Sequence, residues 1–377
     1  MGRRFTWTVL ATALLLAAGV MAFNYRVDPF EQYRKAERHP PRYYPAWQRW
    51  QNPGLARNYD YDRVVTGSSL MENVLPEEVD RVLGGRTINL SVSAQTAYDA
   101  GQLLGVALAT GKTKQVLMNL DYNAFSGDPL RSGFTEPFPT FLYDDRRWND
   151  LPYLLGVGTT RKSLETVLGL RWTRYTTDPN RMWYWADGYR FSAAKAVQGL
   201  EPSNLNARFR QPQRTLQGMQ ASFEANLVPL IERYPGTRFT FLYAPYAILV
   251  WLDFQQRRQL EVTLAFREWA YERTRGYPNV ETFDFHAEPS IVLDLDNFTD
   301  IYHFSPKLSR GILEAMAQGR YRLTPEMVRG NNAWIRRAVR ETTPERVIAE
   351  ARARPAPATP DGKYFVPGGG LVPPASN

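Results

Sequence analysis

The sequence predicts an α/β fold, a three-layer α/β/α sandwich around a five-stranded parallel sheet, with an N-terminal transmembrane helix and a large insertion. Three observations support this prediction. Short apolar runs alternate with helix-period segments along residues 61–325, which is typical of a parallel sheet with helices on both faces. An uncharged apolar run occupies residues 5–23, and no strand-like run occurs between Asn123 and Arg238.

Five short runs rich in β-branched and aromatic residues predict the strands. They are residues 63–66, 87–90, 115–120, 238–243 and 280–285. Apolar residues recur at helical spacing in four segments between or after them, at 76–83, 97–110, 216–234 and 254–271. Ligands of parallel α/β folds bind at the carboxyl ends of the strands, so functional residues are expected there.

The apolar run Phe5–Phe23 is long enough to cross a bilayer. As a helix it would span about 28 Å, at about 1.5 Å per residue. Arg3 and Arg4 precede it, so the positive-inside rule predicts a single-pass signal anchor over residues 1–24, with an extracytoplasmic body. The alternative is a signal peptide cleaved near Val20-Met21-Ala22, which would give a secreted form, but the run is long for one.

The remaining segments are assigned by composition. Residues 25–60 are rich in Pro, Tyr and Trp and predict a juxtamembrane connector. Residues of about 130–215 form the insertion, which either covers the active face or packs as helices on the flank of the sheet. Residues 326–354 predict a C-terminal basic helix, and the Pro/Gly/Ala-rich residues 355–377 predict a disordered tail.

The composition excludes several kinds of chemistry. The 377 residues include no cysteine, which excludes disulfides, cysteine nucleophiles and Cys-ligated metal sites. Only three histidines are present, so a His-rich metal centre is not expected either. The net charge is +8, but the densest basic run, residues 336–354, also carries three glutamates. We therefore expect no nucleic-acid binding, which requires clustered cations.

Two short motifs contain residues suited to serine acyl transfer. Gly67-Ser68-Ser69 follows the first predicted strand at a tight turn, where a hydroxyl can project from the carboxyl end of the sheet. Asp300 precedes His303 by three residues, a spacing at which a carboxylate can orient an imidazole and stabilise its protonated form.

Together with two further segments, these motifs resemble the four blocks of the SGNH (GDSL-type) hydrolases, a family with a flavodoxin-like sheet. Gly67-Ser68-Ser69 is similar to the Gly-Asp-Ser of the family, and Asn89 to Thr96 is similar to its second block. Residues 116–124 are similar to the third block, a strand that ends in Gly-x-Asn-Asp. Asp300 and His303 match the final Asp-x-x-His. The blocks occur in the order of the family and cover about a quarter of the chain.

The resemblance implies a role for each matching residue. Ser69 would be the nucleophile, His303 the general base and then acid, and Asp300 the residue that orients the histidine. The backbone N–H groups of Ser69 and Ala94 and the side chain of Asn123 would form the oxyanion hole. This chemistry needs no cofactor and no metal.

Three positions depart from the family pattern. Ser68 replaces the aspartate of the first block, Ala94 stands in place of the oxyanion glycine, and Asp121 replaces the glycine before the asparagine. Ser68 is therefore a rival nucleophile. Of the other two histidines, His286 is the alternative base and His39 is expected to be inert.

A narrower resemblance comes from the anchor, the insertion and the Gly-Ser-Ser variant. The chain is similar to DltD-type D-alanyl-transfer proteins and to SGNH-like proteins of polysaccharide O-acylation, which act with membrane-bound O-acyltransferases. This implies a membrane-anchored esterase or O-acyltransferase that acts on an acylated cell-envelope polysaccharide or carrier. The alternatives are a catalytically impaired scaffold that binds glycan or docks on such an acyltransferase, which the Ala94 and Asp121 departures favour, and an unrelated α/β binding protein.

Overall fold

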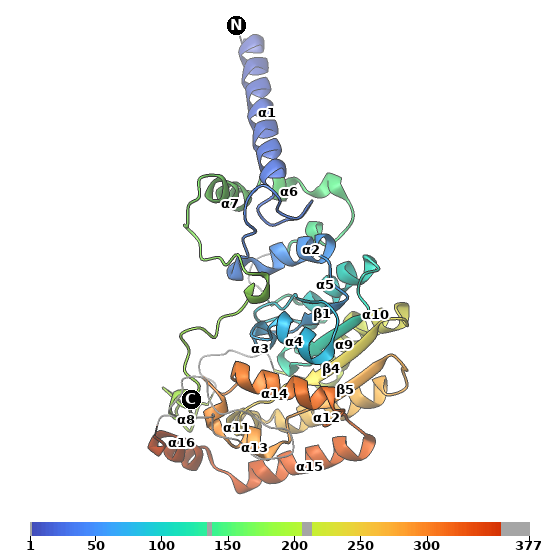
Figure 1. Cartoon of the computed structure of the whole chain (residues 1–377), viewed down its shortest axis with the longest axis vertical. Coiled ribbons are helices and arrows are strands. Elements are labelled where there is room, and N and C mark those ends of the chain that lie inside the picture. The colour runs from blue at the N-terminus through green and yellow to red at the C-terminus, as the bar shows by residue number, and fades with distance from the viewer. Residues whose placement is uncertain (1, 134–137, 206–212, 356–377) are drawn as a thin grey trace. The chain divides into compact units, whose positions relative to one another are not determined.

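The computed structural model describes residues 2–133, 138–205 and 213–355 (Figure 1). Its internal contacts divide the chain into two compact units. The first consists of Met1–Asp60 and Glu136–Trp183, and the second consists of Tyr61–Thr135 and Tyr184–Asn377. The insertion is therefore divided, because its first part joins the N-terminal residues and its last part joins the sheet. The predicted disordered tail, residues 355–377, lies outside the described residues except for Pro355.

The second unit contains one five-stranded parallel sheet with the strand order β2-β1-β3-β4-β5. The strands are β1 (Arg63–Thr66), β2 (Thr87–Asn89), β3 (Gln115–Asn119), β4 (Arg238–Tyr243) and β5 (Val280–Asp284). All five predicted strands are confirmed, each with ends within one residue of those expected. In the register of the sheet, Val65 lies opposite both Asn89 and Leu117. The carboxyl ends of β1, β2 and β3 therefore meet at one edge.

Helices follow the strands in a pattern set by the crossovers. The crossover from β1 to β2 runs toward one edge of the sheet, and the later crossovers run toward the other. Because such crossovers are right-handed, α4 is expected on one face and α5, α9 and α12 on the other. The contacts agree, since α4 contacts α14 while α9 contacts α5 and α12.

The remaining helices complete the unit. The α-helices are α3 (Ser69–Glu72), α4 (Pro76–Leu83), α5 (Ala97–Ala109), α8 (Ala193–Ala196), α9 (Leu216–Asn226), α10 (Val228–Arg233), α11 (Ile248–Gln256), α12 (Leu260–Thr274), α13 (Pro289–Val292), α14 (Pro306–Ala317), α15 (Pro325–Glu341) and α16 (Pro344–Ala353).

Three of the predicted helices are divided, and one of them is misplaced. The segment 216–234 forms α9 and α10, with a proline in the first turn of α10. The helix predicted over 254–271 is wrong at its start, because α11 begins at Ile248 and α12 begins only at Leu260. Arg258 separates them with a φ of +57°, in the left-handed region, which no α-helix can contain. The predicted basic helix is also two helices, α15 and α16, each with a threonine at its N-cap.

The first unit is helical and is held by an aromatic core. Its α-helices are α1 (Gly2–Val27), α2 (Gln48–Asn58), α6 (Leu151–Leu154) and α7 (Val157–Val167). Within the described part of the chain, α1 is the one helix long and apolar enough to cross a membrane. Phe30, Tyr44, Leu142 and Tyr153 form the centre of the core. The predicted connector is thus folded, and part of the insertion packs against it.

Candidate active site

Ser69, His303 and Asp300 form a continuous chain of hydrogen bonds in the second unit. Ser69 Oγ lies 2.7 Å from His303 Nε2, and His303 Nδ1 lies 2.7 Å from Asp300 Oδ2. Ser69 begins α3 directly after β1, while Asp300 and His303 lie in the loop that precedes α14. The backbone N–H groups of Tyr302 and His303 donate to Asp300 Oδ1 at 2.8 and 2.9 Å. The loop therefore fixes the carboxylate and leaves Oδ2 for the imidazole.

The electrostatics of the pair prepare His303 to act as a base. Burial alone would lower the pKa of His303, but the charge of Asp300 and its hydrogen bond outweigh burial and raise this pKa above its ordinary value. Burial would likewise raise the pKa of Asp300, yet the contact with His303 lowers it. An ionised Asp300 accepts the Nδ1–H, so the neutral imidazole presents the lone pair of Nε2 to the hydroxyl of Ser69.

Trp185, which lies in the insertion, contacts both Ser69 and His303. Its ring centroid lies 5.1 Å from that of His303, edge to face, and its Nε1 donates to the carbonyl oxygen of Ser69 at 3.3 Å. The backbone N–H groups of Trp185 and Ala186 donate to Asn73 Oδ1 at 3.0 and 3.1 Å, which fixes this segment. This stretch of the insertion therefore lies against Ser69 and His303.

The three residues expected to form the oxyanion hole follow three adjacent strands. Ser69 follows β1, Ala94 lies in the loop after β2, and Asn123 lies in the 3₁₀ helix Tyr122–Phe125 after β3. Ala94 has a φ of +51°, in the region that favours glycine, so the backbone keeps the conformation that a glycine would adopt there. Arg214 Nη2 donates to Asn123 Oδ1 at 2.6 Å. This bond orients the amide and leaves its Nδ2 end to act as a donor.

Two departures from the family pattern contact each other. Ser68 Oγ donates to Asp121 Oδ2 at 3.0 Å. The serine that replaces the aspartate of the family pattern thus contacts the aspartate that replaces its glycine. Asp121 Oδ1 also accepts from the backbone N–H of Asn123 at 2.9 Å and from Tyr246 Oη at 3.0 Å. The hydroxyl of Ser68 is therefore directed toward Asp121, whereas that of Ser69 contacts His303. This geometry favours Ser69 over its rival as the nucleophile.

The other two histidines take no part in the hydrogen bonds that join Ser69, His303 and Asp300. His286 is buried, and its Nδ1 lies 2.9 Å from Tyr122 Oη. Burial lowers the pKa of His286 to about 3, and its ring stacks on Tyr246 with a centroid separation of 4.7 Å. It is a core residue. The ring nitrogens of His39 contact the backbone carbonyls of Pro40 and Val27 in the first unit.

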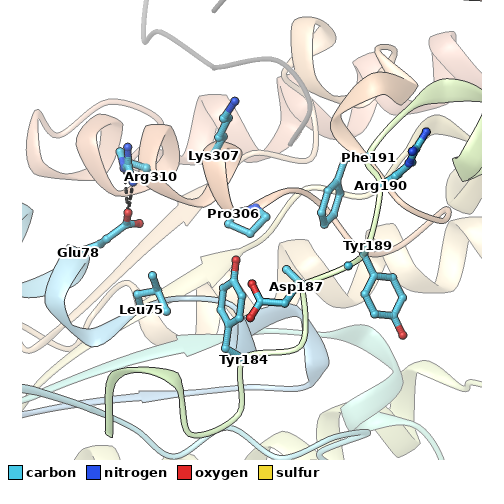
Figure 2. Close-up of a pocket in the computed structure, with 12 residues that line it drawn as sticks. Leu75, Glu78, Tyr184, Asp187, Tyr189, Arg190, Phe191, Pro306, Lys307 and Arg310 are labelled. Atoms are coloured by element: carbon cyan, nitrogen blue, oxygen red, sulfur yellow. Dashed lines mark hydrogen bonds and ion pairs between the residues drawn. The ribbon is translucent and has the colours of Figure 1, made fainter. Parts of the chain in front are cut away.

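A pocket of about 460 Å³ lies in the second unit (Figure 2). Residues 184 and 186–191, on either side of Trp185, face residues of α4 and α14 across it. Arg310 of α14 forms an ion pair with Glu78 of α4 at its rim. Tyr184 and Phe191 contribute aromatic surface, and Lys307 contributes a cation. Among the residues that the structure describes, no group of His, Asp and Glu side chains could hold a metal ion.

Asn123 provides a direct test of the oxyanion hole. Asn123→Ala is expected to lower kcat for an aryl acetate by about 10²- to 10³-fold with little change in KM, because the lost donor acts on charge that develops in the transition state. Asn123→Asp, which keeps the size and removes the donor, is the matched variant and should lose as much. Initial rates measure both. An unchanged kcat for Asn123→Asp would remove Asn123 from the oxyanion hole.

Comparison with models of known protein families gave no match to the sequence, and comparison with curated proteins gave none either. The sequence carries no local signal that identifies Trp185 or Arg214 as residues of this site, because both come from the irregular insertion.

Proposed function

We propose that the protein is a membrane-anchored, extracytoplasmic serine acyl-transfer enzyme of the SGNH type. Its substrate would be an acylated cell-envelope polysaccharide or carrier, and its activity that of an esterase or O-acyltransferase. The observation that carries the proposal is the chain from Ser69 Oγ through His303 to Asp300, with both hydrogen bonds at 2.7 Å. Nucleophile, base and orienting group are within hydrogen-bond reach of each other.

In the proposed first half-reaction, Ser69 Oγ forms a bond to the acyl carbonyl carbon while its proton passes to His303 Nε2. The N–H donors of the oxyanion hole stabilise the charge on the carbonyl oxygen. The carbon–oxygen bond to the alcohol then breaks, and His303 returns the proton to the leaving oxygen. In the second half, water or a sugar hydroxyl attacks the acyl-serine and loses its proton to His303. The Oγ–carbon bond breaks, and Ser69 regains its proton.

The topology supports the assignment to the SGNH type and its α/β/α sandwich. The order β2-β1-β3-β4-β5 reverses the direction of the chain at β1, and ligands of such sheets bind at the carboxyl ends beside that reversal. Ser69 follows β1 and Asn123 follows β3, the two strands at this point. The four motif blocks thus converge on the place where this fold binds its ligands.

The pocket beside Trp185 supports a carbohydrate as donor or acceptor. Tyr184 and Phe191 offer aromatic surface, and Asp187 and Lys307 offer polar groups in the same cavity. Pockets of this size, with a few polar groups on an apolar wall, are typical of small-molecule sites. A membrane-bound O-acyltransferase remains the partner that the family resemblance implies, with α1 as the anchor in the same membrane.

The alternative, a scaffold without activity, draws on the departures at Ala94 and Asp121. The positive φ of Ala94 and the bond between Ser68 and Asp121 weaken it, because both departures fit into an ordered site. A fluorophosphonate probe separates the two hypotheses. It should label the wild-type protein on the peptide that contains Ser69, and labelling should persist in Ser68→Ala and be lost in Ser69→Ala. A wild-type protein that takes up no probe would support the scaffold.

A further inference from the structure

Helix α7 of the first unit has polar residues on its buried side and apolar residues on its exposed side. The buried residues are Thr159, Lys162, Ser163, Glu165 and Thr166. The exposed residues are four apolar ones, Val157 (85%), Leu164 (38%), Val167 (59%) and, directly after the helix, Leu168 (61%), and one cation, Arg161, whose side chain is 56% exposed. Surface helices of water-soluble proteins show the opposite arrangement. The outer face of α7 is therefore suited to an apolar environment.

Contacts of the buried polar side chains stabilise this orientation of α7. Lys162 Nζ lies 3.3 Å from Glu165 Oε1, and Thr173 Oγ1 donates to the same oxygen at 2.9 Å. The ammonium of Lys162 also lies 5.1 Å from the ring centroid of Tyr44 in the core. Because a buried ion pair is costly unless it is well satisfied, these contacts fix which side of α7 faces inward. The apolar face cannot turn inward without breaking them.

The apolar face of α7 continues onto α6 and lies beside the end of α1. Leu151, the first residue of α6, and Leu155, directly after the helix, are 49% and 43% exposed. Both helices contact α1 (Figure 1). Asn24, near the C-terminal end of α1, donates through Nδ2 to Leu154 O and to Thr160 Oγ1, both at 2.8 Å. Helices α6 and α7, which carry the exposed apolar side chains, are thus bound to the end of α1.

The position along α1 at which α6 and α7 make contact sets the depth of these two helices in the bilayer. Most of α1 is exposed, and partial burial begins at Ala17 and continues at Val20 and Met21. Ala17 precedes Phe23, the last residue of the apolar run, by about 9 Å along the helix axis at about 1.5 Å per residue. Helices that lie in a membrane interface insert their apolar face by about 5–10 Å. The distance of about 9 Å from Ala17 to Phe23 lies within this range of insertion depths.

We propose that the exposed apolar residues of α6 and α7 form a lipid-binding surface that inserts into the interface of the bilayer that holds α1. This α6–α7 surface consists of Leu151, Leu155, Val157, Leu164, Val167 and Leu168. The inference rests on the insertion of α1 and is independent of the acyl-transfer reaction.

Lipid is the occupant favoured over a protein because of the residues at the edge of the surface. Trp172 is 53% exposed, and the guanidinium of Arg161 lies 5.7 Å from its ring centroid. Tryptophan is enriched where hydrocarbon meets headgroups, and an arginine near a helix end can extend its charged group to the headgroups. The surface is also continuous with the apolar surface of α1, which has lipid as its surroundings if it spans the membrane.

The absence of cysteine from the sequence allows a direct test with single spin labels. The full-length protein is reconstituted in vesicles of phosphatidylcholine and phosphatidylglycerol, with one label at Val157→Cys or Leu168→Cys. Leu14→Cys in α1 is the lipid-exposed reference. Thr177→Cys, an exposed polar position in the same unit outside α6 and α7, is the water-exposed reference. Electron paramagnetic resonance then compares the accessibility of each label to oxygen, which partitions into lipid, and to a nickel chelate, which stays in water.

We expect the labels at 157 and 168 to favour oxygen, as the label at 14 does, and the label at 177 to favour nickel. Labels at 157 and 168 that respond to nickel as strongly as the label at 177 would overturn the proposal. Labels shielded from both reagents would overturn it in favour of a protein on this surface. A label at 14 that favours nickel would also overturn it, because α1 would then lie outside the bilayer.

Discussion

Replacement of Ser69 by alanine is expected to lower kcat for an aryl acetate by roughly 10⁴- to 10⁶-fold. The variant loses the atom that lies 2.7 Å from His303 Nε2 and has no other nucleophile there. Binding should change little, because the methyl group of alanine is smaller than the hydroxymethyl group and leaves the oxyanion donors in place. Residual activity would come from direct attack of water on the bound ester, with those donors stabilising the charge on its carbonyl oxygen. Single-turnover and steady-state rates measure the loss.

Ser68→Ala is the matched control, because it removes the neighbouring hydroxyl. Ser68 Oγ donates to Asp121, and loss of one such bond costs about 1 kcal/mol, so the rate should stay within roughly tenfold of the wild type. Thermal melting of both variants confirms that they fold. If Ser68→Ala lost activity and Ser69→Ala kept it, Ser68 would be the nucleophile and Ser69 would not. Equal turnover by all three proteins would remove both serines from the mechanism.

Replacement of Asp300 by asparagine is expected to lower kcat/KM by roughly 10⁴-fold and to change its pH dependence. In the wild type, His303 must be neutral to accept the proton of Ser69. Activity should therefore rise with pH through a midpoint above 6.5, because the pKa of His303 is raised. Without the carboxylate, burial is the main remaining influence and lowers the pKa of His303. The midpoint of the residual activity should therefore move to lower pH.

Glu72→Gln is the control for this shift. Glu72 raises the pKa of His303 less than Asp300 does, since its charge acts without a hydrogen bond to the ring. This variant should move the midpoint in the same direction by a smaller amount, without the large loss in rate. Profiles of kcat/KM against pH for the three proteins measure both effects. An unchanged midpoint in Asp300→Asn would mean that Asp300 does not set the charge of His303.

The sheet and the contact between Asp300 and His303 could be predicted because their signals are local. Each strand is a short apolar run followed by a turn, and the fully buried run Arg63–Thr66 is one example. Asp300 and His303 are three residues apart, so one turn brings them together. The helix predicted over 254–271 was wrong at its start. Five polar residues, 255–259, separate Phe254 from the next apolar residue, and within them Arg258 takes a positive φ that ends the helix begun at Ile248.

The rest depends on contacts between segments far apart in the sequence. Arg214 reaches Asn123 from 91 positions away, and Asn24 meets Thr160 from 136 positions away. The first unit exists only because residues 1–60 and 136–183 meet in space. The polarity of α7 also could not be interpreted alone, because an amphipathic pattern shows two faces and does not show which one is buried.

The bonds of Asn24 to Leu154 and Thr160 have a consequence for biosynthesis. A leader peptide is dispensable to the mature fold, whereas the last turns of α1 supply side chains to the first unit. Cleavage near Ala22 would remove Ala17, Val20 and Met21 from beside α6 and α7. The ribosome also completes α1 before residues 151–167 exist, so α1 waits for its partner helices during synthesis. The first unit can therefore assemble only after α7 has been synthesised.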